Sequence, residues 1–99
     1  MADDRLLAYT DERPDSTVGA VTVRRTDDVT YPCGWKYRLH FGTTEGTTLL
    51  RYDNSHERTK GHERHFTENG IERTERIDFP GMDALLNRFY REIEEFQNP

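Results

Sequence analysis

Residues 36–54 read KYRLHFGTTEGTTLLRYDN, and the architecture of the chain can be built outward from them. In the first half, apolar and basic side chains alternate with the period of a strand that buries one face: Tyr37, Leu39 and Phe41 against Lys36, Arg38 and His40. The segment TTEG then turns the chain, so residues 47–54 return as the second strand of a hairpin. There Leu50 and Tyr52 extend the apolar face, whereas Arg51 and Asp53 lie on the opposite face.

The rest of the chain adds further strands and one helix. Strands are predicted at residues 5–10, 18–25, 62–67 and 75–79, and a short helix over residues 3–9 competes with the first of them. After Pro80-Gly81, apolar residues recur at helical spacing: Met82, Leu85, Leu86, Phe89, Ile93 and Phe96. The sequence therefore predicts an α+β fold, an antiparallel β-sheet of about four to six strands with one face covered by a long C-terminal α-helix.

Size and composition limit the class of protein. Ninety-nine residues leave room for a single domain, 1–99, and hydrophobic residues are only 32% of the chain. A partner or a second copy would stabilise so thin a core, so a homodimer is a candidate assembly. There is no apolar run long enough to span a membrane, and the N-terminus MADDRLLAYT lacks the features of a signal peptide. A single cysteine, Cys33, excludes an internal disulfide, and together these features predict a cytoplasmic protein.

Charge is distributed unevenly along the chain. The net charge is −5, which argues against a simple nucleic-acid binder, and twelve arginines stand against two lysines. An acid-rich, lysine-poor composition is typical of proteins from concentrated salt, although a high-GC genome also favours arginine. Residues 34–65 nevertheless carry six bases and four acids and contain all four histidines. The segments on either side, residues 1–33 and 66–99, have net charges of −3 and −4. A bound polyanion would therefore lie on this middle third.

The stretch RYDNSHERTKGHERH, residues 51–65, combines the residue types needed to cleave a phosphodiester without metal. Such a reaction needs an acid and a base near neutral pH and cations on the phosphate. We predict His65 as the leading acid or base, with His62 or His56 second, and Asp53 as the residue that orients a histidine or holds the loop. The predicted substrate-binding residues are Arg38, His40, Arg51, Tyr52, Asn54, Lys60 and Arg64. Among these, Asn54 would fix the turn and Tyr52 would donate a proton or stack on a base.

Three other interpretations of this stretch remain open. A metal-dependent hydrolase could use the histidines with Asp53, Glu57 and Glu63 as oxygen ligands for Zn²⁺ or a similar ion. Against this, His62 and His65 point to opposite faces of a strand, and neighbouring bases repel a cation, so no metal and no other cofactor is predicted. A non-enzymatic module could dock a protein or nucleotide on the same basic face. Finally, the charges could belong to a solvated loop without a task.

Several spaced motifs resemble those of the TumE-like toxins of toxin–antitoxin modules. They occur in the family's order, over roughly residues 35–96: Lys36-Tyr37-Arg38, Tyr52-Asp53-Asn54, Lys60-Gly61, His62 and His65, then Leu85-Leu86 with Phe89. Family members often carry adjacent histidines, or Asp-His, after Lys-Gly, where this chain has His62-Glu63; His65 is therefore the stronger candidate. The resemblance implies a growth-inhibiting toxin whose partner is a cognate antitoxin, usually a small DNA-binding protein. Cleavage of RNA by an endoribonuclease-type mechanism is our own further expectation.

Overall fold

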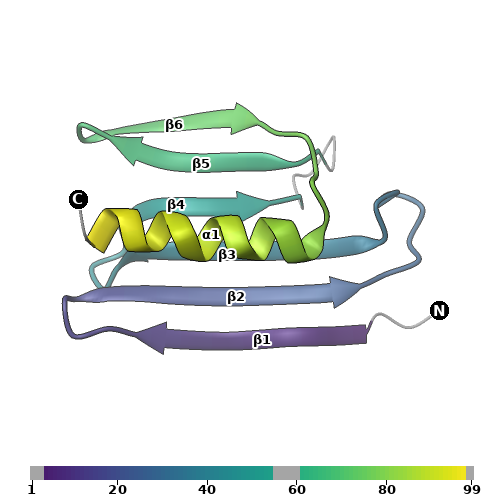
Figure 1. Ribbon diagram of the computed structural model, residues 1–99, viewed down its shortest axis with the longest axis horizontal. Coiled ribbons are helices and arrows are strands. Elements are labelled where there is room, and N and C mark those ends of the chain that lie inside the picture. The colour runs from purple at the N-terminus through teal and green to yellow at the C-terminus, as the bar shows by residue number, and fades with distance from the viewer. Residues whose placement is uncertain (1–3, 55–60, 98–99) are drawn as a thin grey trace.

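The computed structural model describes residues 4–54 and 61–97, and of residues 4–6 the backbone alone. Six strands follow one another and a single helix closes this part of the chain: β1 Asp4–Glu12, β2 Thr17–Arg25, β3 Trp35–Thr43, β4 Thr48–Asp53, β5 Glu63–Glu68, β6 Ile71–Arg76 and α1 Met82–Gln97. The strands form one antiparallel sheet in the order β1-β2-β3-β4-β5-β6, and α1 lies across one of its faces (Figure 1). The predicted α+β fold is confirmed.

Turn chemistry explains why neighbouring strands pair. Between β5 and β6, Asn69 and Gly70 have φ angles of 54° and 78°, so both central residues of this two-residue turn are left-handed. This is the conformation that matches the twist of a tight hairpin, and Asn-Gly adopts it at little cost. Between β3 and β4, Gly46 takes a φ of 101°.

The core lies between α1 and the central strands. Alternate residues of β2, β3 and β4 point toward the helix and are buried: Val21, Val23, Tyr37, Leu39, Phe41, Leu50 and Tyr52. The helix contributes the stripe expected from its sequence, with Leu85 and Phe89 fully buried and Met82 and Ile93 nearly so. Its first turn begins after Gly81, where Asp83 complements the partial positive charge of the helix N-terminus.

The last strand differs from the prediction. The segment 75–79 was predicted to be a strand because Ile77 and Phe79 alternate with polar neighbours, but β6 ends at Arg76. Ile77 and Phe79 instead pack against the core beside the start of α1. Every residue of β6 is exposed, so this strand carries no alternation from which it could have been predicted.

Candidate active site

The face of the sheet opposite α1, here called the open face, carries two rows of polar side chains. In the first row, His40 of β3 pairs with Arg51 of β4, which pairs with His65 of β5, which pairs with Thr74 of β6. Side chains of a strand alternate between faces, and the alternate residues of β3 and β4 lie under the helix. The four residues of this row therefore project together on the open side, as the hairpin pattern predicts for His40 and Arg51.

The second row runs beside the first. Asp53 of β4 lies between Arg38 of β3 and Glu63 of β5, and Glu63 is followed by Arg76 of β6. Directly opposed Cα atoms of antiparallel strands are about 4.5–5.5 Å apart. The two rows thus bring two histidines, two carboxylates and three arginines from four strands onto one surface.

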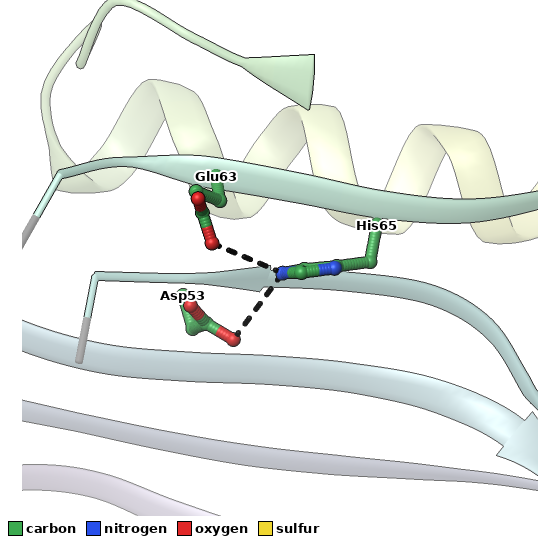
Figure 2. A group of neighbouring side chains, drawn as sticks. All are labelled: Asp53, Glu63 and His65. Carbon is green, nitrogen blue, oxygen red and sulfur yellow. Dashed lines mark ion pairs between the residues drawn. The ribbon is translucent and has the colours of Figure 1, made fainter. Parts of the chain in front are cut away.

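His65 lies between the two carboxylates (Figure 2). Its Nε2 is 3.4 Å from Glu63 Oε1 and 3.9 Å from Asp53 Oδ2, while its Nδ1 is 3.0 Å from the hydroxyl oxygen of Thr74. The residue is only 9% exposed, and Nε2 makes no hydrogen bond with the residues that the structure describes. The ring is therefore held at Nδ1, with Nε2 directed at the carboxylates.

Asp53 also pairs with Arg51. The Nε atom of Arg51 lies 2.9 Å from Asp53 Oδ2, a close ion pair by distance, although the direction of its N–H does not satisfy a hydrogen bond. Arg51 keeps a quarter of its side chain exposed, more than Asp53 at 14%. Its remaining guanidinium donors can therefore meet a ligand on the open face.

His40, at the other side of Arg51, is held by Thr48, whose Oγ1 is 3.0 Å from His40 Nε2. Burial lowers the pKa of His40, and the charges of Arg38 and Arg51 lower it further. Both effects disfavour the protonated ring. The His40 ring is therefore neutral at neutral pH.

A basic hollow adjoins the second row. It has a volume of about 230 Å³ and is lined by Thr22, Arg24, Lys36, Tyr37 and Arg38. Arg24 pairs with Lys36, and Thr22 with Arg38, across β2 and β3. Since Arg38 also pairs with Asp53 on β4, the hollow lies next to the residues around His65.

The predicted role of His62 as a second acid or base requires it to lie beside His65, but the structure places it elsewhere. It lies on the helix side, where its ring stacks on Phe79 at a centroid distance of 4.6 Å and on Tyr37 at 5.7 Å. Its Nδ1 is 2.7 Å from the Tyr37 hydroxyl. Burial lowers the pKa of His62 and raises that of Tyr37, so this hydrogen bond joins a neutral imidazole and a neutral phenol.

Two of the predicted substrate-binding residues, Tyr52 and Arg64, also lie on the helix side. Tyr52 is fully buried and bonds Glu92 of α1 through its hydroxyl. Arg64 pairs with the same Glu92 at 2.5 Å and with Glu75 at 3.0 Å, and it donates to the Tyr52 hydroxyl. This network joins β4, β5 and β6 to the helix, so Arg64 has its charge neutralised away from the open face.

Asn54 is 1% exposed and holds the ends of two strands together. Its Oδ1 accepts from the Tyr37 backbone N–H at 3.0 Å, and its Nδ2 donates to the Trp35 carbonyl at 2.7 Å. The residue thus fixes the end of β4, close to its predicted role in a turn. His56 and Lys60 lie outside the described residues.

Comparison with known proteins gives one result. A protein-family model described as Toxin TumE matches residues 6–97. Neither a curated protein nor a solved structure matches the chain. In the part of the chain that the structure describes, there is no helix long and apolar enough to cross a membrane.

Proposed function

Since the chain belongs to the Toxin TumE family and is the toxin of a toxin–antitoxin module, we propose that it arrests growth by cleaving RNA on the open face of its sheet. The antitoxin is its partner, and we further propose that the antitoxin neutralises it by covering this face with acidic side chains. The flanking thirds of the sequence are acidic, whereas the middle third, which supplies most of the residues in the two rows of the open face, is basic. Acidic side chains of a partner are therefore attracted to the open face by complementary charge.

One observation supports the reaction more than any other, the row His40–Arg51–His65. A cation stands between two histidines on three adjacent strands, so a phosphate held by Arg51 would have one imidazole on each side. With adjacent Cα atoms about 5 Å apart, the two histidine Cα atoms are roughly 10 Å apart, which leaves room for a phosphodiester between the side chains. A proton acceptor and a proton donor on opposite sides of a phosphate suit an in-line displacement.

The substrate is proposed to be a polynucleotide because the basic surface extends beyond a single phosphate. Arg24, Lys36 and Arg38 line the hollow beside the row, on a protein whose net charge is −5. Basic residues concentrated on one surface of an acidic protein attract a polyanion locally and repel it elsewhere. RNA also supplies its own nucleophile, the 2′-hydroxyl, so no bound water has to be activated.

The proposed reaction proceeds as follows. His40, which is neutral, takes the proton of the 2′-hydroxyl as that oxygen attacks the phosphorus, and the bond from phosphorus to the 5′-oxygen breaks. Arg51 and Arg38 stabilise the charge on the phosphate oxygens. In the metal-independent form predicted from the sequence, His65 donates a proton to the departing 5′-oxygen. The products are a 2′,3′-cyclic phosphate and a free 5′-hydroxyl.

A second candidate form is metal-dependent, and the positions of Asp53, Glu63 and His65 favour it. Their ligand atoms all lie within 4.8 Å of one another. A cation held there would stabilise the departing oxygen in place of a proton from His65. Cleavage that survives EDTA indicates the first form, and cleavage lost in EDTA but restored by Mn²⁺ or Zn²⁺ indicates the second.

The experiment for the function itself combines expression with assays on purified protein. Induction without the antitoxin should arrest growth, and the purified chain should cleave RNA to cyclic-phosphate ends. Arg51→Ala should abolish both effects. The control Arg73→Ala removes the same charge from an exposed site on the other face of β6, where Arg73 pairs with Glu68, and should retain them. Growth arrest by a protein that leaves all RNA intact would overturn the proposal.

A further inference from the structure

We infer that Asp53, Glu63 and His65 form a binding site for a divalent transition-metal ion of the Zn²⁺ or Mn²⁺ kind. The three residues come from the facing ends of β4 and β5, and their ligand atoms converge within 4.8 Å (Figure 2). One imidazole nitrogen and two carboxylate oxygens are a donor set that such ions accept. Three protein ligands leave coordination positions for water or a phosphate oxygen.

The second observation is the state of His65. The residue is nine-tenths buried, yet its Nε2 has no hydrogen bond among the described residues. Buried polar nitrogens are nearly always satisfied, so an unpaired one directed at two carboxylates indicates a missing partner. Thr74 bonds the other nitrogen at 3.0 Å. With Nδ1 as the donor to Thr74, Nε2 carries the lone pair that a metal requires, and such a bond on the far nitrogen is usual for histidine ligands.

The distances are close to those of a coordination shell. Ligand atoms at about 2.0–2.2 Å from a tetrahedral ion lie about 3.4 Å from one another. The separation of His65 Nε2 from Glu63 Oε1 is 3.4 Å, and that from Asp53 Oδ2 is 3.9 Å. A small rotation of the Asp53 carboxylate would close the second distance without moving the backbone.

The charges also favour a cation. Two carboxylates with side chains 14% and 18% exposed face His65, and Arg51 is paired with one of them. Among the described ion pairs, none joins Arg38 or Arg76 to these acids, although both stand next to them in the row. Among the described residues, Glu63 therefore has no arginine or lysine partner and only His65 Nε2 within 3.4 Å, so a bound cation would neutralise its charge.

This site differs from the one considered in the sequence. There several histidines were considered as ligands together with Asp53, Glu57 and Glu63, and the opposite directions of His62 and His65 counted against a metal. The structure keeps them apart and instead brings two carboxylates to His65, one from the neighbouring strand. The role of the ion in cleavage rests on the proposed function, whereas its binding does not.

Metal binding should be measured on the full-length, tag-free chain after removal of metal with EDTA and dialysis. Titration calorimetry with ZnCl₂ and MnCl₂ should show one ion per wild-type chain. Glu63→Gln and His65→Gln should each bind at least tenfold more weakly, since each removes a ligand. The matched control is Glu72→Gln, which removes the same charge from an exposed position of the open face and should bind like the wild type.

A second measurement needs no variant. Substoichiometric Mn²⁺ should broaden the amide resonances of Asp53, Glu63 and His65 in the wild-type spectrum before those of other residues, because paramagnetic broadening falls steeply with distance. Broadening centred elsewhere, or equal binding by wild type and Glu63→Gln, would overturn the inference. A chain that cleaves RNA but binds no ion would refute the metal site alone; one that binds the ion but leaves RNA intact would refute the proposed function alone.

Discussion

The side chains of His62 and His65 lie on opposite faces of the sheet, although only two residues separate them. On the helix side, the His62 ring stacks on Phe79 at a centroid distance of 4.6 Å. On the open face, Nε2 of His65 is directed at Glu63 and Asp53. His62 therefore packs at the edge of the core and His65 belongs to the candidate active site, so the two should respond differently to substitution.

His62→Gln should destabilise the fold and leave RNA cleavage intact once the protein is folded. It removes the bond to Tyr37 and the stacking on Phe79, together worth about 1–3 kcal/mol. His65→Gln should behave in the opposite way and lower turnover by about 10²–10⁴-fold. Urea unfolding and single-turnover cleavage of both variants check this; a His62→Gln protein that is fully stable but inactive would contradict the assignment.

Asn54→Ala should cost about 1–3 kcal/mol, because it leaves the buried Tyr37 N–H without its side-chain acceptor and removes the amide donor to the Trp35 carbonyl, which keeps only the Cys33 thiol. The control Asn87→Ala changes an exposed residue of α1 and should stay within about 0.5 kcal/mol of the wild type. Equal unfolding midpoints for both variants would show that Asn54 does not hold the strands.

Phe89→Ala should cost about 3–5 kcal/mol of unfolding free energy. The ring is fully buried and meets Tyr52 edge-on at 6.3 Å, so its removal leaves a cavity between α1 and the sheet. Phe96 is 39% exposed near the end of the same helix, and Phe96→Ala should cost clearly less. Thermal and denaturant unfolding of the pair gives the comparison.

Stability should fall as the pH is lowered below 6.5, the ordinary histidine pKa. Folding lowers the pKa of both His40 and His62, by burial in each case and for His40 also by Arg38 and Arg51. Between the lowered values and 6.5 the unfolded chain binds more protons, so protonation favours unfolding. Urea unfolding at pH about 7.5 and about 5.5 should show a smaller loss for the double variant His40→Gln/His62→Gln than for wild type.

The contribution of the basic hollow to RNA binding should be detectable in the salt dependence of the binding constant. Arg24→Ala and Lys36→Ala should each weaken RNA binding and reduce the slope of log K against log salt by about 0.7, the value for one phosphate contact on a single strand. Arg91→Ala, on an exposed position of α1, should change neither quantity. A slope that falls equally for all three would indicate general electrostatics and not a defined phosphate site.

The hydrophobic pattern was sufficient to predict the architecture. The alternation around Leu39 and the helical stripe around Phe89 each follow from burial on one face, and burial shapes residue choice strongly. The bounds of the last strand could not be predicted, because every residue of β6 is exposed and its sequence shows no burial pattern. Ile77 and Phe79 alternate with polar residues as a strand would, but they lie after β6 and pack at the edge of the core. The competing helix at the N-terminus is wrong, since β1 forms there and pairs with β2.

The candidate site was harder to predict because it is assembled across strands. Arg38, His40, Arg51 and Asp53 could be placed on one face from the hairpin alone. The position of Asp53 beside His65 depends on the register of β4 with β5, and no local pattern sets that register. Tyr52 and Arg64 were predicted as substrate ligands from their residue types, although the hairpin pattern already places Tyr52 on the apolar face. Both lie on the helix side and form a structural network there.

The order of the strands has a consequence for biosynthesis. Each strand pairs with the next, so the sheet is laid down in the order in which the ribosome delivers it. Asp53 is made well before Glu63 and His65, and α1, which covers the apolar side, is made last. A chain on the ribosome therefore holds His40, Arg51 and His65 before α1 is made. At that stage the apolar side of the sheet has no cover, so we expect such a chain to carry the residues of the candidate site without a stable fold to hold them.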